Sequence, residues 1–356
     1  MGAPVRGIEV RTVKFIKQRL CDLPFCYAVN VIQAEGRTKY IFATDDTGPC
    51  YAVDAQTLER ELVWEGPGGT MSIVPVPGQD GTFLASQNFM PGFAAAHARI
   101  VKVTRREGRW AVEPWMELPY VHRFDILERN GMYYFLGCIL SGTDQERAQW
   151  EVPGMLTAAP LSLDFAPPAR LDVIAGGMSR NHGYCKVQRP GFTQAYTACD
   201  QGVFQVTPPE RPDGAWDVLK LIGEAASDVA VCDIDGDGLE ELAVISPFHG
   251  DALRIFRPEK GGYREIYRHP KALPFLHALW GGRLAGRPVF LAGCRGGDRE
   301  LLLIQSSGGM LEARLIEAGF GSSNVAVSLQ DGQPVLLTAN RESHEAALFR
   351  IQEVDA

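Results

Sequence analysis

The chain has 356 residues, 46% hydrophobic and 22% charged, a composition that excludes an intrinsically disordered protein. Its formal net charge of −8 gives no general attraction for phosphate backbones or anionic lipids, so neither nucleic acid nor a membrane is an expected partner. The opening MGAPVRGIEVRTVKF lacks the apolar core of a signal peptide, so the expected location is the cytoplasm. The eight cysteines contain no CxxC pair and are expected to be mostly reduced, buried thiols.

Residues 8–16 form a first strand-like segment, and after it one element recurs seven times. Each copy has an apolar strand, a short turn with glycine, a second apolar strand that ends in small residues, and a polar loop. Successive turn glycines are 45 to 60 residues apart, the spacing of a four-stranded propeller blade. They are Gly36, Gly81, Gly131, Gly191, Gly238, Gly286 and Gly332.

The repeats predict an all-β fold, a single seven-bladed β-propeller over residues 1–356. The predicted blades span about 24–66, 70–118, 120–176, 178–225, 227–273, 275–320 and 322–353, with an insertion at about 139–160 in the third blade. The last repeat is one strand short, and the segment 8–16 has no partner in sequence. We therefore expect the N-terminal strand to complete the last blade and close the ring, which removes exposed sheet edges.

The fifth repeat contains the segment VAVCDIDGDGLEELAVI at 229–245, which resembles the FG-GAP/VCBS repeat of propellers. Asp233, Asp235 and Asp237 alternate, Gly238 permits a tight turn, and Glu241 follows at the ninth position. Hard oxygen ligands in this pattern predict Ca²⁺ in the 233–241 loop. The other six turns lack the ligand set, so the resemblance supports the fold of the whole chain and cation binding once.

Histidines gather where the inner strands begin, at the expected mouth of the central channel. Aligning the seven inner strands places the following residues at one equivalent position: Cys26 or Tyr27, Ser72, His122, His182, Asp228, His277 and Asn324. The loops after the second strands add His97, His249 and His344, so six of the seven histidines lie on one face. The DIDGDG turn falls on the opposite face.

Three imidazoles that point at one axis predict a transition-metal site, with Zn or Mn held by His122, His182 and His277 and open positions for substrate. A metal-free acid–base site, or histidines that only bond to water and carbonyl groups, remain the alternatives. His97, His249, His344 and Tyr184 are the candidate proton-transfer residues. Arg180 and Arg123 are candidates for binding a carboxylate or sugar hydroxyls, with inter-blade salt bridges as the alternative. Arg295, in a loop after a second strand, is a further candidate catalytic residue.

An FG-GAP-like blade together with histidines at the mouth of a seven-bladed ring is similar to the propeller domain of aldos-2-ulose dehydratase and anhydrofructose dehydratase. This resemblance implies a metal-dependent carbohydrate lyase, dehydratase or isomerase that acts on a keto-sugar or sugar acid. A non-enzymatic propeller that binds a ligand or a protein is the alternative. A lactonase-type hydrolase would more naturally gather Asp, Asn and Glu around Ca²⁺.

Overall fold

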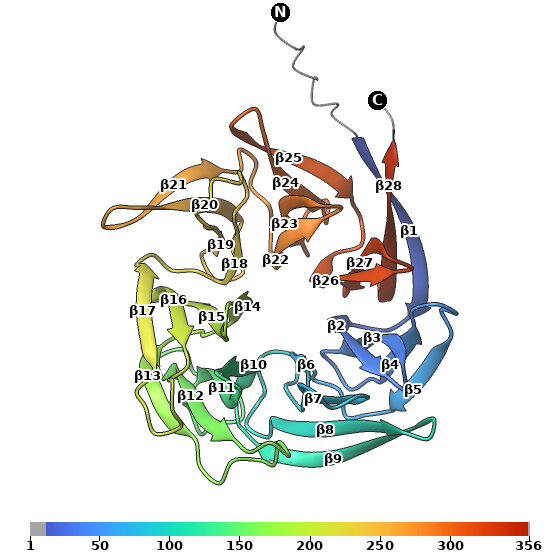
Figure 1. The fold of residues 1–356 in the computed structure, drawn as a ribbon, viewed down its shortest axis with the longest axis vertical. Helices are drawn as coiled ribbons and strands as arrows, with labels where there is room; N and C mark the ends of the chain where they lie inside the picture. The colour runs from blue at the N-terminus through green and yellow to red at the C-terminus, as the bar shows by residue number, and fades with distance from the viewer. Residues whose placement is uncertain (1–11, 355–356) are drawn as a thin grey trace, which may run out of the picture.

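A computed structural model describes residues 12–354, which form 28 strands in seven four-stranded antiparallel blades. The blades surround a central axis, and each innermost strand faces that axis (Figure 1). The seven-bladed propeller predicted from the repeats is confirmed. Among the described residues no helix is long and apolar enough to cross a membrane. All eight cysteines lie in this part of the chain, and none forms a disulfide.

In blades 1 to 6 the strands run outward from the axis in chain order, and in blade 7 the N-terminal strand is outermost. Blade 1 consists of β2 (Cys26–Ala34), β3 (Arg37–Thr44), β4 (Cys50–Asp54) and β5 (Arg60–Trp64). Blade 2 consists of β6 (Ile73–Pro75), β7 (Thr82–Gln87), β8 (Arg99–Arg106) and β9 (Arg109–Glu117). Blade 3 consists of β10 (Val121–Arg129), β11 (Met132–Ser141), β12 (Pro153–Leu161) and β13 (Asp172–Met178).

The remaining blades follow the same order. Blade 4 consists of β14 (Gly183–Arg189), β15 (Phe192–Cys199), β16 (Gly202–Thr207) and β17 (Asp217–Ile222). Blade 5 consists of β18 (Asp228–Cys232), β19 (Glu241–Ser246), β20 (Ala252–Glu259) and β21 (Gly262–Arg268). Blade 6 consists of β22 (Leu276–Leu284), β23 (Arg287–Cys294), β24 (Leu301–Ser307) and β25 (Met310–Glu317). Blade 7 consists of β26 (Ser322–Gln330), β27 (Gln333–Asn340), β28 (Glu345–Val354) and β1 (Thr12–Asp22).

The N-terminal strand closes the ring, as predicted. β1 pairs antiparallel with β28 from Thr12–Val354 to Asp22–Glu345, with one register shift between Arg19 and Cys21, and the two strands run side by side in Figure 1. The predicted bounds 8–16 were too short at the C-terminal end, because pairing continues to Asp22 along the whole of β28. Residues 8–11 lie outside the described residues.

The second strands carry the core between neighbouring blades. Phe42, Phe83, Phe135 and Phe290 come from the second strands of four blades, and all four are fully buried. Burial of one such side chain contributes about 1.5–3 kcal/mol, so the recurring apolar second strand is the main source of the ring's stability. The expected insertion at 139–160 is shorter than predicted, because β11 continues to Ser141 and β12 already begins at Pro153, leaving a loop of residues 142–152.

Candidate metal centre

Strand pairing identifies the equivalent position at the start of the inner strand in every blade. One level in the ring is defined by the inner-strand residues that pair with the following second-strand residues: Ala43, Ala85, Cys138, Ala198, Ile245, Gly293 and Ala339. The residues just before that level are Tyr27, Ser72, His122, His182, Ser227, His277 and Ser323. The sequence alignment had placed Asp228 and Asn324 here. Asp228 and Asn324 lie one residue further along their strands. The pairing between the inner and second strands sets the level, and similarity of residue type does not.

Local irregularities in the strands present these residues to the channel. The ladders shift register at Tyr27, His122, His277 and Ser323, so that each of these residues is the extra residue of a β-bulge. A bulge turns one side chain away from the regular alternation of the strand, and bulges are common beside functional sites. The imidazoles of His122 and His277 are therefore aimed by the backbone of their own strands.

Four imidazoles meet at the axis. The ring of His182 lies at the centre, with centroid distances of 4.1 Å to His122, 4.8 Å to His249 and 5.3 Å to His277. The Nε2 atoms of His182 and His249 are 3.2 Å apart. One ligand nitrogen from each of His182, His249 and His277 lies within 4.8 Å of the others. We call His122, His182, His249 and His277 the imidazole cluster.

This geometry changes the predicted ligand set. His122, His182 and His277 were predicted to share the metal, with His249 as a proton-transfer residue. The structure groups His249 with His182 and His277, because the loop after β19 folds inward over the axis. The Oγ of Ser227 accepts the backbone N–H of His249 at 3.1 Å and helps to fix that loop. Sequence reasoning gave Ser227 no role.

Backbone carbonyl groups orient the three inner-strand imidazoles. The Nδ1 of His122 lies 3.2 Å from the carbonyl oxygen of His182, the Nδ1 of His182 lies 3.1 Å from that of Ser227, and the Nδ1 of His277 lies 2.7 Å from that of Ser323. A carbonyl oxygen can only accept, so each Nδ1 carries the proton. Each Nε2 therefore presents a lone pair, as metal-binding histidines do.

Burial keeps the cluster neutral. It lowers the pKa of His122, His182 and His277 well below the usual histidine value, and neighbouring positive charges add to this effect. The pKa of His249 falls to about 3, first because of burial and then because of Arg295 and Arg180. Neutral imidazole is the form that binds a metal, so at neutral pH these four side chains already have the protonation state that a metal ion requires.

The hydroxyl of Tyr27 completes the polar part of the site. It lies 3.2 Å from the Nε2 of His277 and 3.5 Å from the Nε2 of His122. Burial raises the pKa of Tyr27 to about 12, so the phenol keeps its proton at neutral pH. Tyr27 stands at the same repeat position as the histidines, which is the sequence signal that marks it.

A cavity of about 180 Å³ opens above the imidazole cluster. Phe89, Phe93 and Phe275 form part of its wall, and the ring of Phe89 packs edge-on against His122. Arg295 and Arg341 also line it. Both guanidinium groups pair with Glu342, at 2.7 Å and 3.2 Å respectively. The cavity thus combines imidazole and guanidinium nitrogens with phenylalanine rings that limit the access of water.

Several predicted acid–base residues lie away from the cluster. The side chain of His97 is 82% exposed and lies 3.6 Å from Glu146. His344 is exposed, and its Nδ1 accepts the backbone N–H of Phe25 at 3.0 Å. Both residues lie in loops after second strands, as predicted. The side chain of His97 is exposed to solvent, and that of His344 contacts backbone. Arg180, in contrast, lies near the cluster: its guanidinium is over the rings of Trp150 and Phe248, Phe248 stacks on His249, and Asp200 is 3.6 Å away.

Tyr184 was also predicted to act beside the histidines. It lines a different cavity, deeper in the channel, and its backbone N–H donates to Asp228 at 3.1 Å. Its hydroxyl is buried without a hydrogen-bond partner among the described residues. The cause is its place on β14: Tyr184 is two residues beyond His182, so it lies further along the channel.

The DIDGDG turn brings three carboxylates together. Asp233, Asp235 and Asp237 each offer an oxygen within 4.8 Å of the others. Glu241 is not part of this group. It is buried, accepts the N–H of Ile234 at 3.0 Å, and pairs with Arg257, which also contacts Asp235. The predicted set of four ligands is therefore divided: the three aspartates lie together at the surface, and Glu241 is buried and bonded to Ile234 and Arg257.

The predicted Ca²⁺ site can be tested by thermal unfolding. We expect the free energy of unfolding to rise with free Ca²⁺, by about 2.7 kcal/mol at 100 times the Kd, because the folded loop alone holds Asp233, Asp235 and Asp237 together. Asp235→Ala should remove the response, and Asp213→Ala, in an exposed loop elsewhere, should keep it. Calcium sensitivity unchanged in Asp235→Ala would show that the loop does not bind the ion.

Comparisons with known proteins agree with this architecture. Residues 225–262 match the FG-GAP repeat, and no curated protein matches the chain in sequence. The chain is a β-propeller that carries one FG-GAP repeat. Resemblance to the dehydratases named above receives no support from these comparisons.

Solved structures share the fold at low sequence identity. A protein of unknown function from Desulfotomaculum acetoxidans has 12% identity and a TM-score of 0.52, over 87% of this chain and 88% of that one. A candidate 6-phosphogluconolactonase from Bacteroides uniformis has 12% identity and a TM-score of 0.53, over 90% of both chains. Sqt1 of Saccharomyces cerevisiae has 10% identity and a TM-score of 0.56, over 91% of this chain and 83% of that one. These likenesses concern the fold alone.

Proposed function

We propose that this propeller is a transition-metal-dependent enzyme of the lyase, dehydratase or isomerase kind, acting on a keto-sugar or sugar acid at the mouth of its channel. The observation that carries the proposal is the orientation of the inner-strand histidines. Each Nδ1 is held by a backbone carbonyl of the next blade, and each Nε2 turns toward the axis. Metal-binding histidines are commonly oriented by such a contact at the ring nitrogen that does not bind the metal.

One spacing in the cluster matches the separation of two ligands on a metal such as Zn²⁺. Two tetrahedral nitrogen ligands at ~2.0–2.1 Å from zinc are about 3.3–3.4 Å apart, close to the 3.2 Å between the Nε2 atoms of His182 and His249. His182, His249 and His277 would hold the ion. When bound, it would polarise a substrate carbonyl and lower the pKa of the neighbouring C–H group.

Proton transfer falls to two residues beside these ligands. His122 is neutral with its Nε2 lone pair toward Tyr27, so it can accept the proton from the carbon next to the carbonyl group. The phenol of Tyr27 can donate a proton to the departing hydroxyl, which leaves as water. Phe89 and Phe275 restrict water around the anionic intermediate, and Arg295 carries positive charge on the cavity wall.

A turnover assay tests the proposal. The protein is stripped with a chelator, reloaded with Zn²⁺ or Mn²⁺, and given a panel of keto-sugars and sugar acids, with formation of the unsaturated product followed by its absorbance. We expect metal-dependent turnover, and we expect Tyr27→Phe to keep its metal but lose turnover by about 100-fold or more. Metal-loaded protein that binds members of the panel without converting any of them would instead favour the non-enzymatic binding propeller.

A further inference from the structure

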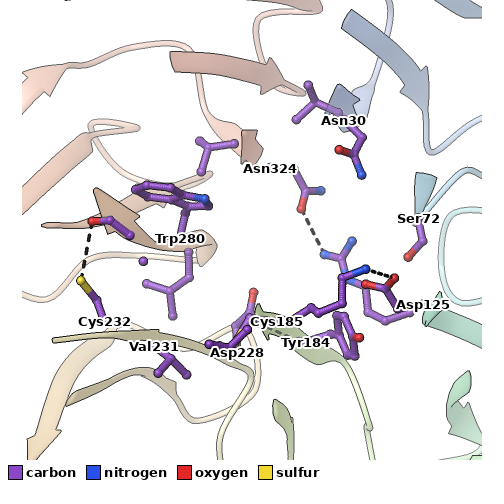
Figure 2. Close-up of a pocket in the computed structure, with 18 of the residues that line it drawn as sticks. Asn30, Ser72, Asp125, Tyr184, Cys185, Asp228, Val231, Cys232, Trp280 and Asn324 are labelled. Carbon is purple, nitrogen blue, oxygen red and sulfur yellow. Dashed lines mark hydrogen bonds and ion pairs between the residues drawn. The ribbon is translucent and has the colours of Figure 1, made fainter. Parts of the chain in front are cut away.

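A second cavity lies in the channel below the imidazole cluster. Its volume is about 580 Å³, within the ~300–1,000 Å³ typical of small-molecule sites. It is lined by inner-strand residues of all seven blades and the start of the DIDGDG turn, and it shares Met71 with the cavity above. We call it the lower cavity; Figure 2 shows the side chains that surround it.

The lower cavity has two unlike walls. Blades 3 to 5 contribute Arg123, Asp125, Lys186 and Asp228, whereas blade 6 contributes the indole ring of Trp280. Figure 2 shows Trp280 across the cavity from Asp125 and Tyr184. A charged, hydrogen-bonding wall that faces an aromatic ring suits a ligand with hydroxyl groups around its edge and an apolar face.

Arg123 has no carboxylate partner within ion-pair distance in the described part of the chain. Its guanidinium donates to the carbonyl of Met71 at 2.5 Å and to the Oδ1 of Asn324 at 3.2 Å. The nearby carboxylate of Asp125 is already paired with Lys186 at 2.5 Å. Arg123 is therefore fixed in place by neutral groups and keeps donor capacity for a ligand.

Asp228 supplies acceptor capacity on the same wall. It is buried, and its Oδ1 accepts the backbone N–H groups of Tyr184 and Val229 at 3.1 Å and 2.9 Å. Burial raises the pKa of Asp228 to about 7, so near neutral pH its carboxyl group can donate as well as accept. Hydroxyl groups, which do both, match this pair of residues.

Two glycines make room for the aromatic wall. A Cβ atom on Gly282 would lie 2.7 Å from two ring carbons of Trp280, so the indole rests directly over that glycine. A Cβ atom on Gly281 would lie 2.6 Å from the carbonyl oxygen of Val231. The Gly281–Gly282 pair thus keeps Trp280 against the channel wall, where its ring lines the cavity.

We propose that the lower cavity is a second ligand site, for a sugar ring that stacks on Trp280 and hydrogen-bonds through its hydroxyl groups to Arg123 and Asp228. The aromatic ring would cover the apolar face of the sugar, and the opposite wall would hydrogen-bond to the hydroxyl groups around its edge. This site is separate from the imidazole cluster and requires no metal. It goes beyond the proposed function and stands whether or not the mouth of the channel is catalytic.

Calorimetric titration with D-glucose, D-galactose, D-mannose and D-glucuronate tests this site. We expect saturable binding of at least one sugar to the metal-free wild-type protein, unchanged in Trp216→Ala, a tryptophan elsewhere in the fold. His182→Ala, which disrupts the mouth of the channel, is titrated alongside. Trp280→Ala should weaken binding about tenfold, as expected for the loss of an aromatic contact. Gly282→Ala, which displaces the indole without removing it, should weaken binding similarly and replaces Trp280→Ala if that variant does not fold.

Three outcomes would overturn the proposal. One is full binding by both Trp280→Ala and Gly282→Ala. Another is binding that disappears in His182→Ala but survives in the other variants, which would place the sugar at the mouth of the channel. The third is no heat of binding for any of the four sugars with folded wild-type protein.

Discussion

His182→Ala is expected to purify without its transition metal and without turnover, while it keeps its fold. His182 is the central imidazole, with the rings of His122, His249 and His277 all within 5.3 Å. Loss of an outer residue that only orients a ligand costs ~10–100-fold in metal affinity, so loss of the ligand itself should cost at least about 100-fold. Elemental analysis of the purified variant measures the effect.

Matched variants separate metal loss from general damage. His97→Ala changes an exposed histidine on the same face and should retain metal at the wild-type level. The cost to folding in His182→Ala should be about 1–3 kcal/mol, because the carbonyl of Ser227 loses its donor in a buried place. His182→Ala protein with a full complement of metal would contradict the assignment of His182 as a ligand.

Deletion of residues 1–22 should leave no soluble, cooperatively folding protein. Without β1, the whole of β28 becomes an exposed edge, since the two strands pair from Thr12–Val354 to Asp22–Glu345. Open edges promote association between chains, and Val13 and Phe15 would also be lost from the core between blades 6 and 7. Solubility after lysis, followed by calorimetry of any soluble fraction, measures this.

The control is deletion of residues 1–11, which precede β1. This shorter deletion keeps every β1–β28 pair and should leave solubility and the Tm unchanged. A soluble protein of residues 23–356 with a single sharp unfolding transition would show that the ring does not depend on its N-terminal strand.

The fold was predictable because a propeller blade is a local pattern. Successive turn glycines are 45 to 60 residues apart, each followed by an apolar second strand, and ring closure followed from one missing strand. The level of the histidines was predictable for the same reason: His122, His182 and His277 recur at one place in the repeat. Tyr27 stands at that place too, which marks it as part of the site.

Register and loop conformation were not predictable to single residues. Bulges at Tyr27, His122, His277 and Ser323 insert one residue into four of the ladders, whereas β18 pairs with β19 without a shift. The sequence alone did not show which blades have a bulge, so Asp228 and Asn324 were aligned where Ser227 and Ser323 lie. His249, His97 and His344 occupy comparable loops in sequence. The inward fold of the His249 loop depends on contacts such as Ser227 with its backbone N–H, which no periodicity reveals.

Elemental analysis of the wild-type protein, combined with anomalous diffraction at the absorption edge of the metal found, tests the central claim most directly. The account predicts one transition-metal ion per chain, bound at about 2.0–2.3 Å by the Nε2 atoms of His182 and His277 together with a ring nitrogen of His249. Protein that contains no transition metal after purification and takes up none when Zn²⁺ or Mn²⁺ is supplied, with the four imidazoles in the same positions, would contradict it.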